Sequence, residues 1–149
     1  MDFGDTLRLR LRHAYLKFHR CAQLQLANSG VTADQFILLC FLAESDGLIQ
    51  KDLVELSGSD SSTIAAMVKI LEKKGLISKV RDASDGRAFQ IRLTAKGKKK
   101  QQQLTPKVKD LRNSLSDAIS PDDQEAVLRA LEQIDLVMSK TLKDNENKR

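Results

Sequence analysis

Residues 76–93 read LISKVRDASDGRAFQIRL, two segments of alternating apolar and polar residues that flank a polar turn at Asp82–Arg87. This alternation predicts two half-buried strands joined as a hairpin. Just before the hairpin, residues 60–74 have the apolar spacing of an amphipathic helix, which Gly75 closes. A helix followed at once by a hairpin with a basic tip is typical of a winged helix-turn-helix. We therefore predict a mainly α fold with a small antiparallel β wing (α+β).

The positive charge of the chain gathers around the same stretch. The net charge is +5, and residues 60–100 hold eleven Lys and Arg against four acidic residues, whereas the rest of the chain holds fourteen against sixteen. Such a cluster is the electrostatic footprint expected for phosphate binding, although the charge alone also fits a solvated basic face. Together with the hairpin, it favours double-stranded DNA as the partner. The helix would enter the major groove, and the basic tip would reach an adjacent minor groove.

The composition indicates one compact domain with an aliphatic core. The chain has 149 residues, of which 41% are hydrophobic and only 4% aromatic. No apolar run reaches the roughly 18–20 residues that cross a bilayer, and the first residues lack the pattern of a secretion signal. Two cysteines, Cys21 and Cys40, do not make a disulfide framework. We expect a cytoplasmic protein without a membrane partner.

The helix predicted before the hairpin has one apolar and one polar face. Its core-facing residues follow the spacing i, i+3, i+4 and i+7, and they are Ile64, Met67, Val68 and Leu71. The outward face, which we predict to contact DNA, consists of Ser61, Ser62, Thr63, Ala65, Ala66, Lys69 and Lys73. Asp60 or Ser59 is expected to cap the helix by accepting from its first free N–H groups. Lys73 suits the negative end of the helix.

Local signals place the elements that precede this helix. Thr32 with Gln35 three residues on predicts a capping box at the start of a buried helix. Residues 51–56 predict a helix of under two turns, and Ser57-Gly58-Ser59 predicts the turn of the helix-turn-helix. Leu48-Ile49 is short and apolar, so we expect it to pair with the wing as a third strand.

Three longer helices are predicted outside this core, at residues 5–27, 95–118 and 121–143. Thr94 is expected to cap the second of them, which Pro106 should bend or split because proline removes a backbone hydrogen bond and clashes with the preceding turn. Ser120-Pro121 is a strong start for the third.

Each outer helix carries one apolar stripe that a single subunit has little surface to cover. Helices of this kind usually bury their stripes against a second copy, so we expect a homodimer. The alternative is a monomer in which the helices pack as a layer on their own domain. The predicted organisation is a helical dimerisation region at residues 1–30 and 95–149 and a winged DNA-binding domain at residues 31–94.

Several short motifs recur together between about residue 31 and residue 105. The most specific are Asp60-x-Ser62-Thr63, LEKKGLI at residues 71–77, Arg81-Asp82-x-x-Asp85-x-Arg87 and Leu93-Thr94-x-x-Gly97. In these motifs, and in the pattern and length of the flanking helices, the chain resembles the MarR (multiple-antibiotic-resistance) family of regulators. The resemblance implies a homodimer that binds an inverted-repeat operator and usually represses nearby genes. It also implies a pocket for a small-molecule effector between the dimer helices and the winged domain, which Tyr15 and Phe18 could line, although core packing explains these two residues equally well.

The resemblance assigns roles to single residues. By this match Arg87 is the wing-tip arginine that enters the minor groove, Asp85 the acid that steadies the tip, and Arg81 a basic residue at the base of the wing. Family members often carry threonine and arginine where this chain has Ala65 and Ala66. Because small apolar side chains cannot read guanine bidentately, we expect lighter base readout and more affinity from phosphates and minor-groove shape.

Other chemistries find little support in the sequence. There is no nucleophile–base constellation, Gly-rich phosphate loop or pair of acids, so we expect no enzyme and no cofactor. His13 and His19 lie six residues apart, off the i, i+4 spacing of a metal pair, so we expect no metal. A redox sensor at Cys21 would need an activated thiol, and its neighbours in sequence do not face it on a helix. Two alternatives to a regulator remain, a winged-helix module that binds a protein and a protein that binds DNA without sequence preference.

Overall fold

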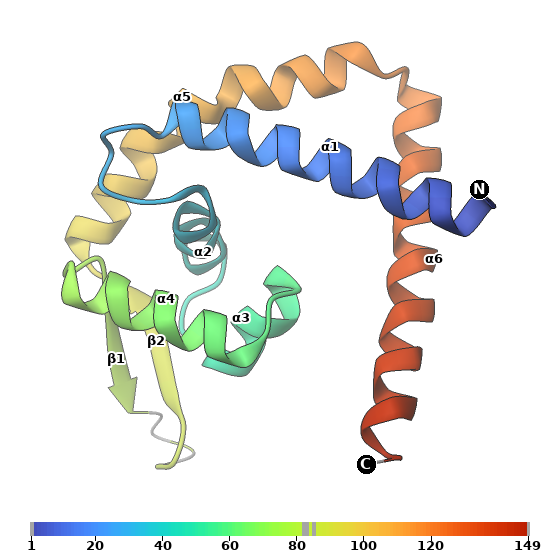
Figure 1. Ribbon diagram of the computed structural model, residues 1–149. Coiled ribbons are helices and arrows are strands. Elements are labelled where there is room, and N and C mark those ends of the chain that lie inside the picture. The colour runs from blue at the N-terminus through green and yellow to red at the C-terminus, as the bar shows by residue number, and fades with distance from the viewer. Residues whose placement is uncertain (1, 82–83, 85, 149) are drawn as a thin grey trace. The chain divides into compact units, whose positions relative to one another are not determined.

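The computed structural model, shown in Figure 1, describes residues 2–81, 84 and 86–148. The elements, in chain order, are α1 (Phe3–Gln25), α2 (Ala33–Glu44), α3 (Gln50–Ser57), α4 (Ser61–Lys73), β1 (Ile77–Arg81), β2 (Phe89–Leu93), α5 (Ala95–Ala118) and α6 (Pro121–Glu146). Over the described residues they confirm the predicted fold class, six helices with a two-stranded antiparallel sheet. The chain forms two compact units, Met1–Lys109 and Asp110–Arg149, and α5 runs from the first into the second.

The wing is an antiparallel ladder that starts at the helical body of the first unit. Ile77 pairs with Leu93 at its base, and Arg81 pairs with Phe89 next to the tip. Leu48 adds an isolated antiparallel bridge to Ile91, whose N–H donates to the Leu48 carbonyl over 2.7 Å. The predicted pairing with the wing is therefore confirmed, but as a single bridge and not as a third strand, and it ties the segment before α3 to the wing.

The core of the first unit is aliphatic, as the composition predicted. Its most buried side chains come from three helices, and they are Leu39 of α2, Leu53 of α3, and Ile64 and Leu71 of α4, each 0% exposed. The spacing predicted for α4 is confirmed, since Ile64, Val68 and Leu71 are buried and Met67 packs against the same core. These contacts fix α4 with its other face turned outward.

Side-chain caps begin the helices where the sequence predicted them. The Thr32 hydroxyl accepts from the Gln35 N–H while the Gln35 side chain accepts from the Thr32 N–H, which completes the capping box. Thr94 caps α5 by accepting from the Gly97 N–H over 3.0 Å. Ser120 caps α6 by accepting from the Asp123 N–H. Gly75 adopts φ +70°, the left-handed conformation that ends α4.

Pro106 does not split α5, so that alternative of the prediction is wrong. The helix is continuous from Ala95 to Ala118. Proline removes one hydrogen bond, but Leu104 and Val108 on either side are both buried in the core of the first unit. Their packing holds the helical conformation across the missing bond.

A close backbone contact joins the start of α5 to the start of the wing. A Cβ placed on Gly97 would lie 1.8 Å from the carbonyl oxygen of Leu76. The same carbonyl accepts from the Thr94 N–H over 3.1 Å. Only glycine allows α5 and the entry to β1 to approach this closely.

None of the described helices combines the length and the apolarity needed to span a bilayer.

Candidate nucleic-acid interface

Helices α3 and α4 form the helix-turn-helix. Helix α3 ends at Ser57, its C-cap Gly58 adopts the left-handed conformation at φ +68°, and Asp60 caps the start of α4. The predicted outward face is exposed at every position, namely Ser61, Ser62, Thr63, Ala65, Ala66, Lys69 and Lys73. The fold therefore brings all seven of these residues onto one accessible face of one helix.

Asp60 does more than cap α4. Its Oδ1 atom accepts from the Thr63 N–H over 2.8 Å and from the Ser62 hydroxyl over 2.6 Å, and its Oδ2 atom accepts from the Thr63 hydroxyl over 2.9 Å. These bonds, led by that from the Ser62 hydroxyl, lower the pKa of Asp60 from 3.8 to about 2. The carboxylate is exposed to solvent and is ionised at any physiological pH.

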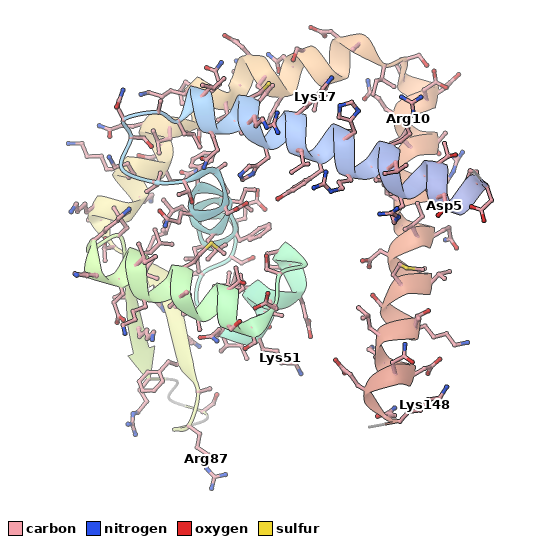
Figure 2. The ribbon with its side chains drawn as sticks, in the orientation of Figure 1. Asp5, Arg10, Lys17, Lys51, Arg87 and Lys148 are labelled. Atoms are coloured by element: carbon pink, nitrogen blue, oxygen red, sulfur yellow. The ribbon has the colours of Figure 1, made fainter. Side chains whose placement is uncertain are left out.

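The wing carries cations toward its tip. Figure 2 shows Arg87 at the far end of the wing, on the opposite side of the first unit from Lys17 on α1. The Arg81 guanidinium lies over the Phe89 ring, 5.5 Å from its centroid, in a cation–π contact. Because Arg81 pairs with Phe89 at the end of the ladder next to the tip, its predicted position at the wing base is wrong. The predicted role of Asp85 lies outside the described residues.

Three of the lysines near the wing form hydrogen bonds within the fold. The ammonium groups of three lysines donate to backbone carbonyls: Lys96 to Lys74, Lys100 to Ser29, and Lys74 to Gly30. These bonds join the end of α4 and the α1–α2 turn to the start of α5. Each ammonium group keeps its positive charge, and these bonds fix where the three cations lie. Sequence reasoning missed these contacts, because their partners lie 22 to 71 residues away.

A pocket of about 270 Å³ opens within the first unit between α1, α2 and the start of the helix-turn-helix. Its lining is Tyr15, Phe18, His19, Ala22, Ala33, Asp34, Ile37, Leu38, Ser57, Ser59 and Met67. The Tyr15 and His19 rings stack at 5.8 Å, and the His19 Nδ1 atom lies 3.8 Å from Asp34 Oδ1. The lining is mostly apolar, with one acid and one imidazole, so it suits a small aromatic molecule with a polar group.

The cysteines and histidines form no further centre in the part of the chain that the structure describes. Cys21 is exposed, and Cys40 is partly buried against the core rather than fully inside it. The side-chain amide of Gln101 lies 3.9 Å from the Cys40 sulfur. Among the described residues, no three His, Cys, Asp or Glu side chains gather to hold a metal ion.

Comparison with known sequences assigns the winged segment to a family. The sequence model of the MarR family matches residues 31–89. The HTH-type transcriptional regulator TtmR of Methylorubrum extorquens is 35% identical over 81 residues, which are 54% of this chain and 42% of that protein. The uncharacterized HTH-type transcriptional regulator YdgJ of Bacillus subtilis is 31% identical over 85 residues, which are 57% of this chain and 48% of that protein. The matched segments thus span under half the length of these two relatives.

Solved structures share the fold over most of its length. BpsR of Bordetella bronchiseptica, whose DNA binding is regulated by 6-hydroxynicotinic acid, has a TM-score of 0.79 and 23% identity, with 90% of this chain and 96% of that chain covered. The transcriptional repressor CouR, bound to a 23-mer DNA duplex, has a TM-score of 0.74 and 25% identity, with 90% and 97% covered. TtmR and YdgJ are both named as transcriptional regulators, in agreement with the expectation that the chain is not an enzyme.

Proposed function

We propose that this chain is a DNA-binding transcriptional regulator of the MarR family, whose sequence model matches residues 31–89. The observation that carries the proposal is the exposed face of α4 beside a wing that ends in Arg87 (Figure 2). A helix of this width fits the major groove, and an arginine at a protruding tip suits the negative potential of a narrow minor groove. CouR, which is similar in fold, binds a DNA duplex. Operator binding would take place in the cytoplasm.

The face of α4 suggests how affinity is divided. Ala65 and Ala66 can touch a thymine methyl group but offer no hydrogen bond to a base. Lys69 and Lys73 are exposed on the same face and would meet phosphates. We therefore propose that base readout is concentrated at the start of α4, and that phosphate contacts and the wing supply much of the remaining affinity.

We further propose that the protein acts as a homodimer. Helices α1 and α6 are described in full, and none of their residues is buried. Large apolar side chains stand exposed on both, among them Phe3 at 81% and Leu128 at 67%. Exposed apolar surface of this extent favours cover by a second copy. A two-fold dimer would present two α4 helices about 34 Å apart, the spacing of an inverted repeat on one face of DNA.

An effector would act through the pocket between α1, α2 and the helix-turn-helix. The pocket is bounded by Tyr15 and Phe18 of α1 and by Met67 of α4. A ligand that fits only one placement of α4 relative to α1 would shift the population of the form that binds DNA. If the ligand-free protein is a repressor bound to its operator, such a ligand would release it from the DNA. In the same way, 6-hydroxynicotinic acid regulates the DNA binding of BpsR.

Titration with the DNA upstream of its own gene tests the proposal. Tight, site-selective binding whose affinity falls steeply with salt is expected, since phosphate contacts release counterions. A flat or absent response would identify a winged-helix module that binds a protein instead. If any competitor DNA displaces the upstream DNA equally well, the protein binds DNA without site preference.

Replacement of Arg87 by alanine is expected to weaken operator binding about tenfold at moderate salt and to reduce its salt dependence, because one minor-groove cation is lost. Fluorescence anisotropy with labelled operator at several salt concentrations measures both effects. The control is Lys17→Ala, which removes the same charge from the far side of the first unit (Figure 2). If Arg87→Ala binds the operator with wild-type affinity at all salt concentrations, the wing does not contact DNA.

A thermal-shift screen with phenolic acids and other small aromatic acids tests the pocket. Any compound that raises the melting temperature of the wild type is expected to do so less for Tyr15→Ala, because this change removes an aromatic wall of the pocket. Tyr15 is 58% exposed, so the fold should tolerate its loss. Leu24→Ala, on the same helix and outside the pocket lining, is the control. An unchanged shift for Tyr15→Ala would place the ligand elsewhere.

A further inference from the structure

The hydroxyl protons at the start of α4 already take part in hydrogen bonds within the protein. A serine or threonine hydroxyl has one proton to donate, and those of Ser62 and Thr63 both point to the Asp60 carboxylate, at 2.6 and 2.9 Å. An ionised carboxylate accepts only, so the direction of both bonds is fixed. What these three side chains still offer outward is lone pairs. We call Asp60, Ser62 and Thr63 the acceptor cluster.

Capping alone does not require this arrangement. A cap needs one oxygen to accept from one backbone N–H, and Asp60 meets that need with the Thr63 N–H over 2.8 Å. At the start of α1, Asp2 does no more than this, accepting from the Asp5 N–H over 2.8 Å. The two hydroxyl bonds at Asp60 are additional, and they orient two exposed side chains of the face proposed to meet DNA.

The acceptor cluster is poorly suited to phosphate. Phosphate oxygens are anionic acceptors, so they need donors, and the Asp60 carboxylate repels them. In the major groove, guanine N7 and O6 and thymine O4 are also acceptors. The groups that match lone pairs are the amino groups of cytosine N4 and adenine N6, and acidic side chains are known to accept from cytosine N4.

We propose that the acceptor cluster selects a base edge bearing an amino group, cytosine or adenine, at one position of each operator half-site. The inference rests on the proposed function, in which α4 enters the major groove. Asp60 then acts as a specificity-determining residue in two ways. It orients the hydroxyls of Ser62 and Thr63 as acceptors, and its charge disfavours any register in which the start of α4 meets a phosphate.

Selection of binding sites from a random duplex pool tests the proposal with wild type, Asp60→Ser and the matched control Asp2→Ser. Serine keeps a capping oxygen while it removes the charge and frees the two hydroxyl protons. The wild type is expected to confine one position per half-site to cytosine or adenine on one strand. Asp60→Ser is expected to reduce the base preference at that position about tenfold and to leave the preferences at the other positions unchanged. Asp2→Ser removes the same charge and cap from α1 and should select the wild-type site.

Affinity for unselected duplex separates this role from a merely structural one. Loss of a helix cap would weaken binding to selected and unselected DNA in parallel. Loss of the acceptor cluster is expected to lower the affinity for selected DNA. It is expected to raise the affinity for unselected DNA severalfold, since one negative charge has left the interface. A parallel loss on both kinds of DNA would overturn the proposal.

A second measurement uses the wild-type protein and altered DNA, so it does not depend on the folding of any variant. At the restricted position, cytosine is replaced by 2-pyrimidinone, or adenine by purine, each of which lacks only the amino group. Binding is expected to fall about tenfold there and to stay unchanged for the same replacement at an unrestricted position. Wild-type affinity on both duplexes would overturn the inference while the proposed function stands. If the wild type selects no site at all, the proposed function fails and this inference fails with it.

Discussion

Replacement of Leu131 by glutamate is expected to convert the protein to monomers and to weaken operator binding by about a hundredfold or more. Leu131 is one of the exposed large apolar side chains of α6 and is 40% exposed in the single chain. In a two-fold dimer the change would bury an unpaired carboxylate twice, at a cost of roughly 3–5 kcal/mol for each. A monomer holds only one half-site at a time and loses the gain in effective concentration that joins the two. Analytical ultracentrifugation measures the assembly, and anisotropy with labelled operator measures the binding.

The matched control is Gln133→Glu. Gln133 is exposed on α6 two residues further on, and at 3.6 residues per turn it faces away from Leu131. The same charge there should leave both assembly and DNA binding unchanged. Circular dichroism should give the same helix content for both variants, because α6 contains no buried residue. A dimer that persists in Leu131→Glu would contradict the assignment of α6 to the interface.

Replacement of Gly97 by alanine is expected to lower the free energy of unfolding by roughly 3 kcal/mol. The new Cβ would lie 1.8 Å from the Leu76 carbonyl oxygen and 2.8 Å from its carbon, so backbone must move. The movement would also strain the bond from the Thr94 N–H to that carbonyl, which joins α5 to the wing. The gain of about 1 kcal/mol from alanine over glycine in a helix does not offset this. Urea titration followed by circular dichroism measures the change.

Gly4→Ala is the control for this experiment. Gly4 is also a glycine in the first turn of a helix, and among the described residues a Cβ there would meet Asp2 Oδ1 at the ordinary contact distance of 3.5 Å. We expect its free energy of unfolding to match the wild type or rise slightly. Equal stability of Gly97→Ala and Gly4→Ala would show that α5 and the wing entry can separate without loss.

The local features of the fold followed from the sequence because they depend on residues a few positions apart. A capping box needs only Thr32 and Gln35, and the left-handed end of α4 needs only Gly75. The outward face of α4 followed from the period of the helix and was exposed at each predicted position. The candidate DNA-contacting face was therefore predictable as a set, although its contact with DNA stays a prediction.

Features that depend on distant partners were not predictable in the same way. The sequence marked Pro106 as a helix breaker, but burial of Leu104 and Val108 keeps α5 continuous. The lysines near the wing counted toward a nucleic-acid footprint, yet Lys74 and Lys100 donate to carbonyls of the α1–α2 turn. Composition gives the number of charges, and only the packed chain determines where each of them is held.

The sequence by itself determined the winged helix-turn-helix, its caps and the side of α4 that faces outward, since backbone propensity and apolar period act over one or two turns of chain. Tertiary structure decided the glycine contact between α5 and the wing and the carbonyl partners of the lysines. At the start of α4 both contribute. The sequence supplies a capping aspartate, and the folded helix turns two neighbouring hydroxyls toward it, so that their lone pairs are left for a partner.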